Sequence, residues 1–102
     1  MPRKEHKSTP TIVGRFLYTE QAALPLDSDA FFDWLTHHST FYFDSPLGTF
    51  TARREPRANG LFWYAFRRYR KHLYKAYLGR STDLTSARLL TVAQDLALKA
   101  GT

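Results

Sequence analysis

Hydrophobic and polar residues alternate along much of this chain, a pattern typical of half-buried β-strands, and two stretches change to a helical spacing. Residues 11–18 are β-branched and aromatic, so we predict one strand there, with Gly14 weakening the strand or marking a bulge. Residues 19–26 follow as a connector that is closed by Pro25. A strand and a connector therefore precede the first helical stretch.

A short helix is predicted over residues 28–38. Ser28 is a suitable N-cap, and Phe31, Trp34 and Leu35 share one face at i, i+3 and i+4. The last helix has a stronger signature: Thr85 is its N-cap, and an apolar stripe follows at helical spacing. That stripe consists of Leu89, Val92, Ala93, Leu96 and Ala97, and Gly101 stands at the C′ position.

Four further strands are predicted between the two helices, over residues 39–45, 48–55, 61–69 and 72–80. Residues 45–48 form the first turn, and residues 56–60 form a loop with an Asn-Gly signal. The last two strands form a hairpin around Arg70-Lys71. Because neither residue favours positive φ, a two-residue turn and a longer one both remain open.

These elements predict an α+β fold: an antiparallel sheet of three to five strands packed against a C-terminal helix, with a short additional N-terminal helix. The length of 102 residues suits one domain. We expect a flexible basic arm over residues 1–10 and a single domain over residues 11–102, whose core sheet-and-helix unit spans about 49–98.

Charge is strongly segregated along the sequence. Residues 51–80 hold nine of the fifteen Lys and Arg residues but one of the nine Asp and Glu residues, whereas residues 16–50 contain no Lys or Arg. The net charge is +6, and this segregation places a positive field at one end of the folded molecule, as is usual in proteins that bind polyanions. Seven of the sixteen aromatic residues lie in the same basic segment, which favours folded strands over a disordered basic tail.

Strand alternation separates this segment into two faces. A turn at Arg70-Lys71 places Trp63 opposite Leu78, Ala65 opposite Ala76, and Tyr64 opposite Tyr77. We expect Trp63, Ala65, Ala76 and Leu78 to face the last helix. The opposite face and its rim then hold the candidate nucleic-acid-binding residues, which are Arg53, Arg57, Tyr64, Phe66, Arg68, Arg70, Lys75 and Tyr77.

Two other interpretations of that face stay open. The helix that carries Phe31 and Trp34 would hide Tyr64 and Phe66 if it lay over them, and the arginines would then be a solvated rim. Alternatively, Tyr64, Phe66 and Tyr77 bury against a partner chain.

Other chemistry is sparse. The chain has no cysteine, and adjacent histidines at 37–38 point about 100° apart on a helix, so we expect no metal site. No phosphate loop, nucleophile elbow or paired-carboxylate motif is present, and we expect neither an enzyme nor a cofactor. No apolar run approaches the roughly 18 residues of a membrane span. We expect a cytoplasmic protein with no membrane partner.

The strand order and the junction YLGRSTDLTSARLL resemble the three-stranded-sheet-plus-helix DNA-binding fold of plant ethylene-response-factor domains and of the arm-binding domains of tyrosine recombinases. Residues 75–79, Lys-Ala-Tyr-Leu-Gly, stand where the plant domains have a basic residue, a spacer, Trp and Leu-Gly. Tyr77 therefore replaces Trp. In that family the basic and aromatic pair faces DNA. The resemblance covers about residues 49–98.

A wider resemblance rests on FFDWLTHHSTFYFDSPLGTFTARRE, FWYAFRR, YLGRSTDLT and ARL. These segments are similar to the amino-terminal module of large LuxR-type regulators of filamentous green non-sulfur bacteria. The resemblance implies that the module belongs to a longer regulator chain. Our leading expectation is a non-enzymatic DNA-binding module in transcription or recombination that contacts double-stranded DNA. A protein-interaction or dimerisation module is second, and RNA binding is third.

Overall fold

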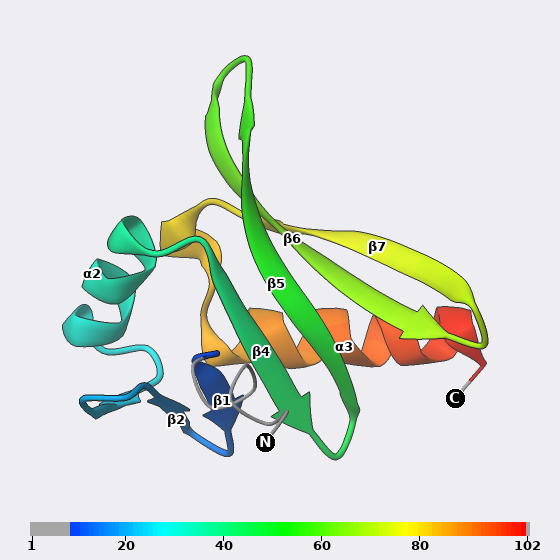
Figure 1. Cartoon of the computed structure of the whole chain (residues 1–102), viewed down its shortest axis with the longest axis horizontal. Coiled ribbons are helices and arrows are strands. Elements are labelled where there is room, and N and C mark those ends of the chain that lie inside the picture. Colours follow the sequence, from blue (N-terminus) through cyan, green and yellow to red (C-terminus); the bar gives the residue numbers. More distant parts are fainter. Residues whose placement is uncertain (1–8, 102) are drawn as a thin grey trace, which may run out of the picture.

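A single twisted sheet forms the centre of the computed structural model, which describes residues 9–101 (Figure 1). Its seven strands are arranged in the order β3-β2-β1-β4-β5-β6-β7, and every neighbouring pair is antiparallel except β1 and β4. The strands are β1 (Thr11–Val13), β2 (Phe16–Tyr18), β3 (Ala23–Pro25), β4 (Thr40–Ser45), β5 (Gly48–Arg57), β6 (Gly60–Tyr69) and β7 (His72–Gly79). The helices are α2 (Asp29–His37), the 3₁₀ turn η1 (Ser81–Asp83) and α3 (Ser86–Ala100).

The predicted α+β class and the C-terminal helix are confirmed, but the sheet has more strands than the three to five expected. Within residues 9–101, three strands precede the short helix α2, so this helix is not the N-terminal element that was expected. Residues 11–18 form a hairpin instead of one strand, since Gly14 adopts φ +65° and turns the chain so that Val13 pairs with Phe16. The expected connector 19–26 contributes β3.

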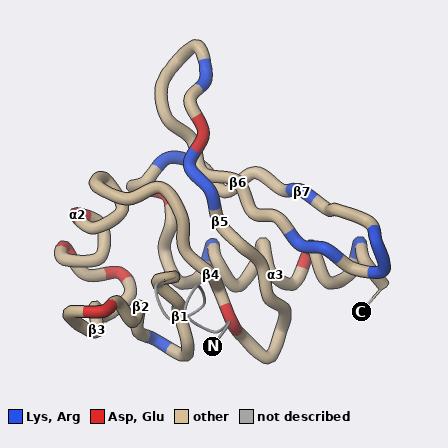
Figure 2. The backbone as a smooth tube through the Cα atoms, viewed as in Figure 1, with Lys and Arg blue, Asp and Glu red and all other residues tan. Residues whose placement is uncertain are grey.

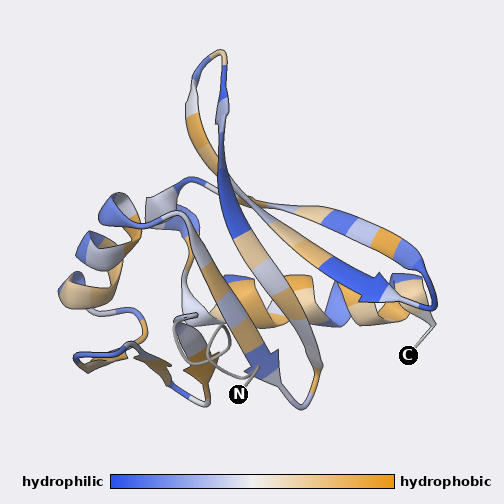
Figure 3. Ribbon diagram, viewed as in Figure 1, coloured by the Kyte–Doolittle hydropathy of each residue, from blue (hydrophilic) through white to orange (hydrophobic). Residues whose placement is uncertain are grey.

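Both α-helices of residues 9–101 pack on the same side of the sheet. Phe31 and Leu35 of α2 are fully buried in the core cluster that also holds Leu89 and Leu96 of α3. The apolar residues recur along α3 where the strands cross it (Figure 3). Turn β4–β5 approaches this helix very closely: a Cβ on Gly48 would lie 2.6 Å from the Ala93 carbonyl oxygen. The core therefore fills the space between one sheet face and two helices.

The C-terminal end of α2 is completed by side chains. Nδ1 of His37 and Nδ1 of His38 donate to the carbonyls of Asp33 and Trp34, at 3.0 and 2.9 Å. Nη1 of Arg54 donates to the next two carbonyls, those of residues 35 and 36, each at 3.0 Å. These bonds pair carbonyl groups that a helix end would otherwise leave open.

The hairpin β6–β7 turns at two residues, Arg70 and Lys71, which adopt φ 53° and 67°. This settles the open choice in favour of the tight turn, whose backbone twist matches that of the strands. The predicted pairs of residues 64 with 77 and 65 with 76 are confirmed. Trp63, however, pairs with Gly79 and not with Leu78, because a bulge between residues 63 and 64 shifts the strand register.

Strands β5 and β6 extend beyond their neighbours as a two-stranded ribbon. Strand β4 pairs with β5 only as far as Arg53, whereas β5 and β6 continue to pair from Arg54↔Trp63 to Arg57↔Gly60. The expected loop at 56–60 is thus mostly strand, and its turn consists of Ala58 and Asn59. We call residues 55–62 the β5–β6 arm, which projects away from the sheet (Figure 1).

Most of the basic arm predicted over residues 1–10 lies outside the described residues. Across residues 9–101, no helix is both long enough and apolar enough to cross a bilayer.

Candidate nucleic-acid interface

The sheet face turned away from α2 and α3 carries two rows of residues that continue across four strands. We call this the outer face, and no element of residues 9–101 covers it. Side-chain alternation and strand register place the rows side by side. One row is Thr40, Arg53, Tyr64 and Tyr77, and the next is Tyr42, Thr51, Phe66 and Lys75.

Burial agrees with this assignment of faces. Ala52, Trp63 and Ala65 are fully buried, whereas the alternating neighbour Arg53 is exposed and Tyr77 is 48% exposed. Helix α2 does not lie over Tyr64, because its apolar residues are buried in the core on the opposite side. The interpretation in which this helix hides the aromatic face is therefore wrong.

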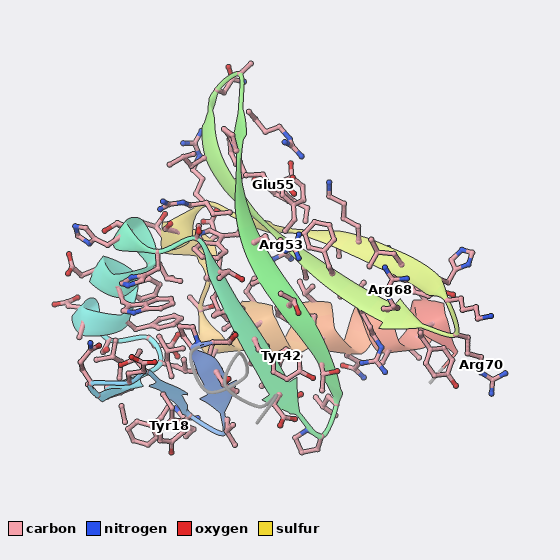
Figure 4. The ribbon with its side chains drawn as sticks, in the orientation of Figure 1. Tyr18, Tyr42, Arg53, Glu55, Arg68 and Arg70 are labelled. Carbon is pink, nitrogen blue, oxygen red and sulfur yellow. The ribbon has the colours of Figure 1, made fainter. Side chains whose placement is uncertain are left out.

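Six of the eight predicted site residues gather on β5, β6 and β7 of the outer face, and Arg57 extends the group onto the arm. Those six are Arg53, Tyr64, Phe66, Arg68, Lys75 and Tyr77. Arg53 and Arg68 are labelled in Figure 4. Arg70 stands apart at the tip of the β6–β7 hairpin. Its guanidinium lies 5.3 Å from the ring centroid of Tyr69, a residue that alternation places on the helix side. Arg70 therefore belongs to the rim.

Cationic groups lie directly on the aromatic rings of this surface. The Lys75 ammonium is 4.4 Å from the ring centroid of Tyr64 and 5.4 Å from that of Phe66. The guanidinium of Arg57 is 4.8 Å from the Tyr64 centroid, and that of Arg53 is 5.7 Å from the Phe66 centroid. Such contacts attract a cation to the ring face, so the rings hold the positive groups at fixed places.

A single carboxylate lies among these cations. Oε1 of Glu55 is 2.6 Å from Nη2 of Arg57 and 3.6 Å from Nζ of Lys75. The hydrogen bond to Glu55, with a further one to Tyr64, raises the pKa of Arg57 above its ordinary value. Glu55 was not among the predicted site residues. Its signal was that it is the one acidic residue among residues 51–80.

Arg80 is a second residue that the sequence analysis missed. Its guanidinium lies 4.8 Å from the ring centroid of Phe62, and its Nη1 is 3.7 Å from the place a Cβ on Gly60 would take. Positive charge therefore reaches the root of the β5–β6 arm.

Hydroxyl groups also border the basic surface. A shallow hollow on the outer face is lined by Thr9, Thr11, Thr40, Tyr42, Thr51 and Arg53. A second hollow shares Thr51 and Arg53 with the first and continues to Arg68. Threonine and tyrosine hydroxyls beside arginine are groups that contact phosphate oxygens. Sequence alone gave no reason to place β1 beside β4.

Two basic residues of the same segment serve the fold instead. Arg54 binds the carbonyls at the end of α2. Arg67 points to the helix side of β6, and its Nη1 donates to the carbonyl and the hydroxyl of Thr49, at 3.1 and 2.9 Å. The other Lys and Arg residues still make the β5–β7 side of the molecule positive. Acidic residues collect around α2 and β3 (Figure 2).

Among residues 9–101, no group of three or more His, Cys, Asp or Glu residues is placed to hold a metal ion. No protein-family model, curated protein or solved structure matches this chain.

Proposed function

We propose that this protein is a non-enzymatic DNA-binding module and that the outer face of β5–β7 contacts duplex DNA. The observation that carries the proposal is the grouping of Arg53, Arg57, Arg68 and Lys75 on one sheet face that no described element covers. Lysine and arginine neutralise phosphates, and most contacts between proteins and DNA go to the phosphate and sugar backbone. A row of hydroxyls from β1, β4 and β5 borders these cations and extends the surface for phosphate contacts.

The geometry of the aromatic rings favours duplex DNA over single strands. Binding of single strands relies on stacking bases against open ring faces. Here Lys75 occupies the faces of Tyr64 and Phe66, and Arg57 lies on Tyr64 as well. Phosphates can approach these cations without displacing them, whereas a stacked base has to remove them first. RNA and single-stranded DNA are therefore the weaker ligands in this proposal.

The biological setting follows from the resemblance to the amino-terminal module of LuxR-type regulators. On that basis, we place the DNA contact in transcription regulation within a bacterial, cytoplasmic regulator. The resemblance of residues 75–79 to the plant DNA-binding domains supports the same face, since Lys75 and Tyr77 are the residues it assigns to DNA.

A protein-interaction or dimerisation module is the second candidate, and one observation favours it. Val13, Phe16 and Tyr18 are 48%, 40% and 48% exposed, and they lie on the outer face at the end remote from the basic strands. Exposed apolar groups that lie together are common at protein interfaces. This patch is separate from the cations, so the two functions predict different partners for different parts of the sheet.

The test is a fluorescence anisotropy titration with labelled random duplex DNA, single-stranded DNA and RNA of equal length. We expect duplex to bind most tightly, with log affinity falling linearly against log salt. Three to five phosphate contacts give a slope of roughly −3 to −4.5. Binding weaker than about 10⁻⁴ M for every nucleic acid at low salt contradicts the proposal.

A further inference from the structure

The β5–β6 arm is long enough to reach into a groove of DNA. Three pairs, from Glu55↔Phe62 to Arg57↔Gly60, lie beyond the last residues that pair with β4 or β7, and two turn residues follow. At about 3.3 Å per residue the arm reaches roughly 10–13 Å past the sheet. The major groove of B-DNA is about 12 Å wide and 8.5 Å deep, and it admits a two-stranded β-ribbon.

The tip of the arm is narrow and makes no part of the core. Every residue from Pro56 to Leu61 is exposed, and the turn residues are Ala58 and Asn59. Small residues there allow the backbone to approach base edges.

The root of the arm carries positive charge, and contacts with aromatic rings hold the charged groups in place. Arg80 stacks on Phe62, and Arg57 stacks on Tyr64, so two guanidinium groups flank the strands where they leave the sheet. A duplex whose phosphates contact these two guanidinium groups would have its groove next to the arm. Charge complementarity therefore selects DNA as the occupant.

We propose that the β5–β6 arm enters the major groove of duplex DNA and that the Asn59 side-chain amide reads adenine there. This inference rests on the proposed function and adds the part that recognises sequence. Asparagine pairs with adenine through N6 and N7, in the major groove. The sheet face and the arm then have different roles, because phosphate contacts set affinity and base contacts set sequence preference.

The experiment selects preferred sites from a randomised duplex library with the whole chain. The same selection is made with Asn59→Ala and with Gln94→Ala, a matched control that removes an exposed amide from α3. We expect the wild type and the control to select the same adenine-containing site. The Asn59→Ala variant loses preference at that base pair by about tenfold or more, with an unchanged salt slope.

Replacement of the selected adenines by 7-deazaadenine gives a second measurement, because it removes the N7 acceptor from the major groove. The substitution weakens binding of the wild type but not of Asn59→Ala. Duplex binding without any sequence preference, or a preference that survives Asn59→Ala, overturns the inference and leaves the proposed function standing. Absence of duplex binding by the wild type overturns the proposed function and, with it, the inference.

Discussion

Glu55 and Arg57 form a hydrogen-bonded ion pair on the outer face, with 2.6 Å between Oε1 and Nη2, and the same oxygen lies 3.6 Å from Nζ of Lys75. One carboxylate is therefore shared by two of the cations that we propose contact DNA. In the proposed complex this carboxylate competes with a phosphate oxygen for both cations, and its negative charge repels a phosphate. In the account proposed here, Glu55 limits the affinity for DNA.

Glu55→Gln should bind duplex DNA more tightly than the wild type. The variant releases Arg57 and Lys75 for phosphates, so the salt dependence should steepen by about 0.9 for each cation that gains a phosphate. Anisotropy titrations at several salt concentrations measure both effects. Glu20→Gln is the matched control, because Glu20 is exposed on the turn between β2 and β3 and the charge change is equal. Weaker binding by Glu55→Gln would mean that the carboxylate positions the cations instead.

Ala65→Leu should destabilise the fold by about 1–3 kcal/mol, because the added methylenes overpack a closed site. Ala65 is fully buried in the core cluster between β6 and α3. Urea unfolding followed by tryptophan fluorescence measures the change. Ala87→Leu, at an exposed position on α3, should change the free energy of unfolding by no more than about 0.5 kcal/mol. Equal effects at both sites would contradict the packing described here.

Gly48→Ala should destabilise the protein more than Gly14→Ala does. Both glycines have positive φ, but a Cβ on Gly48 would lie 2.6 Å from the backbone oxygen of Ala93, whereas nothing lies within 4 Å of a Cβ on Gly14. The change at Gly14 carries only the cost of a left-handed backbone, about 1–2 kcal/mol. The melting temperatures of the two variants, measured by thermal unfolding, show which one is less stable. The reverse order would show that turn β4–β5 does not press on α3.

The hairpin β6–β7 shows how far sequence patterns determine this fold. A two-residue turn at Arg70-Lys71 was sufficient to pair Ala65 with Ala76, and alternation put Tyr77 on the exposed face. Alternation cannot reveal a bulge, and the one at residues 63–64 moved the partner of Trp63 by one position. The strands at the other edge are only three residues long, too short for their period to be read.

The candidate site was predictable to a similar degree. Strand parity brought Arg53, Arg68 and Lys75 together, because parity depends only on sequence separation and on one turn. The sequence could not predict that Arg54 donates hydrogen bonds to the carbonyls at the end of α2, or that the Arg80 guanidinium lies on the ring of Phe62. Both contacts depend on how distant elements pack.

The free protein should be monomeric at micromolar concentration. Sedimentation equilibrium at low and high salt measures this directly. A tight, salt-insensitive dimer that becomes monomeric in Tyr77→Ala would identify the basic face as a dimer interface. A dimer lost in Phe16→Ser but retained in Tyr77→Ala would place the interface on the apolar patch of β1 and β2, and would leave the basic face open to DNA.

The most direct test of the account is a charge reversal on the outer face, Arg68→Glu with Lys75→Glu. Both side chains are exposed, so the domain should stay folded by circular dichroism. The matched control is Arg15→Glu with Lys99→Glu, two exposed residues that do not lie on the outer face of β5–β7, and it changes the net charge equally. We predict that duplex binding is abolished in the first variant and only mildly weakened in the control. Binding of low-salt duplex by the Arg68 and Lys75 variant as tightly as by the control would contradict the assignment of this face to DNA.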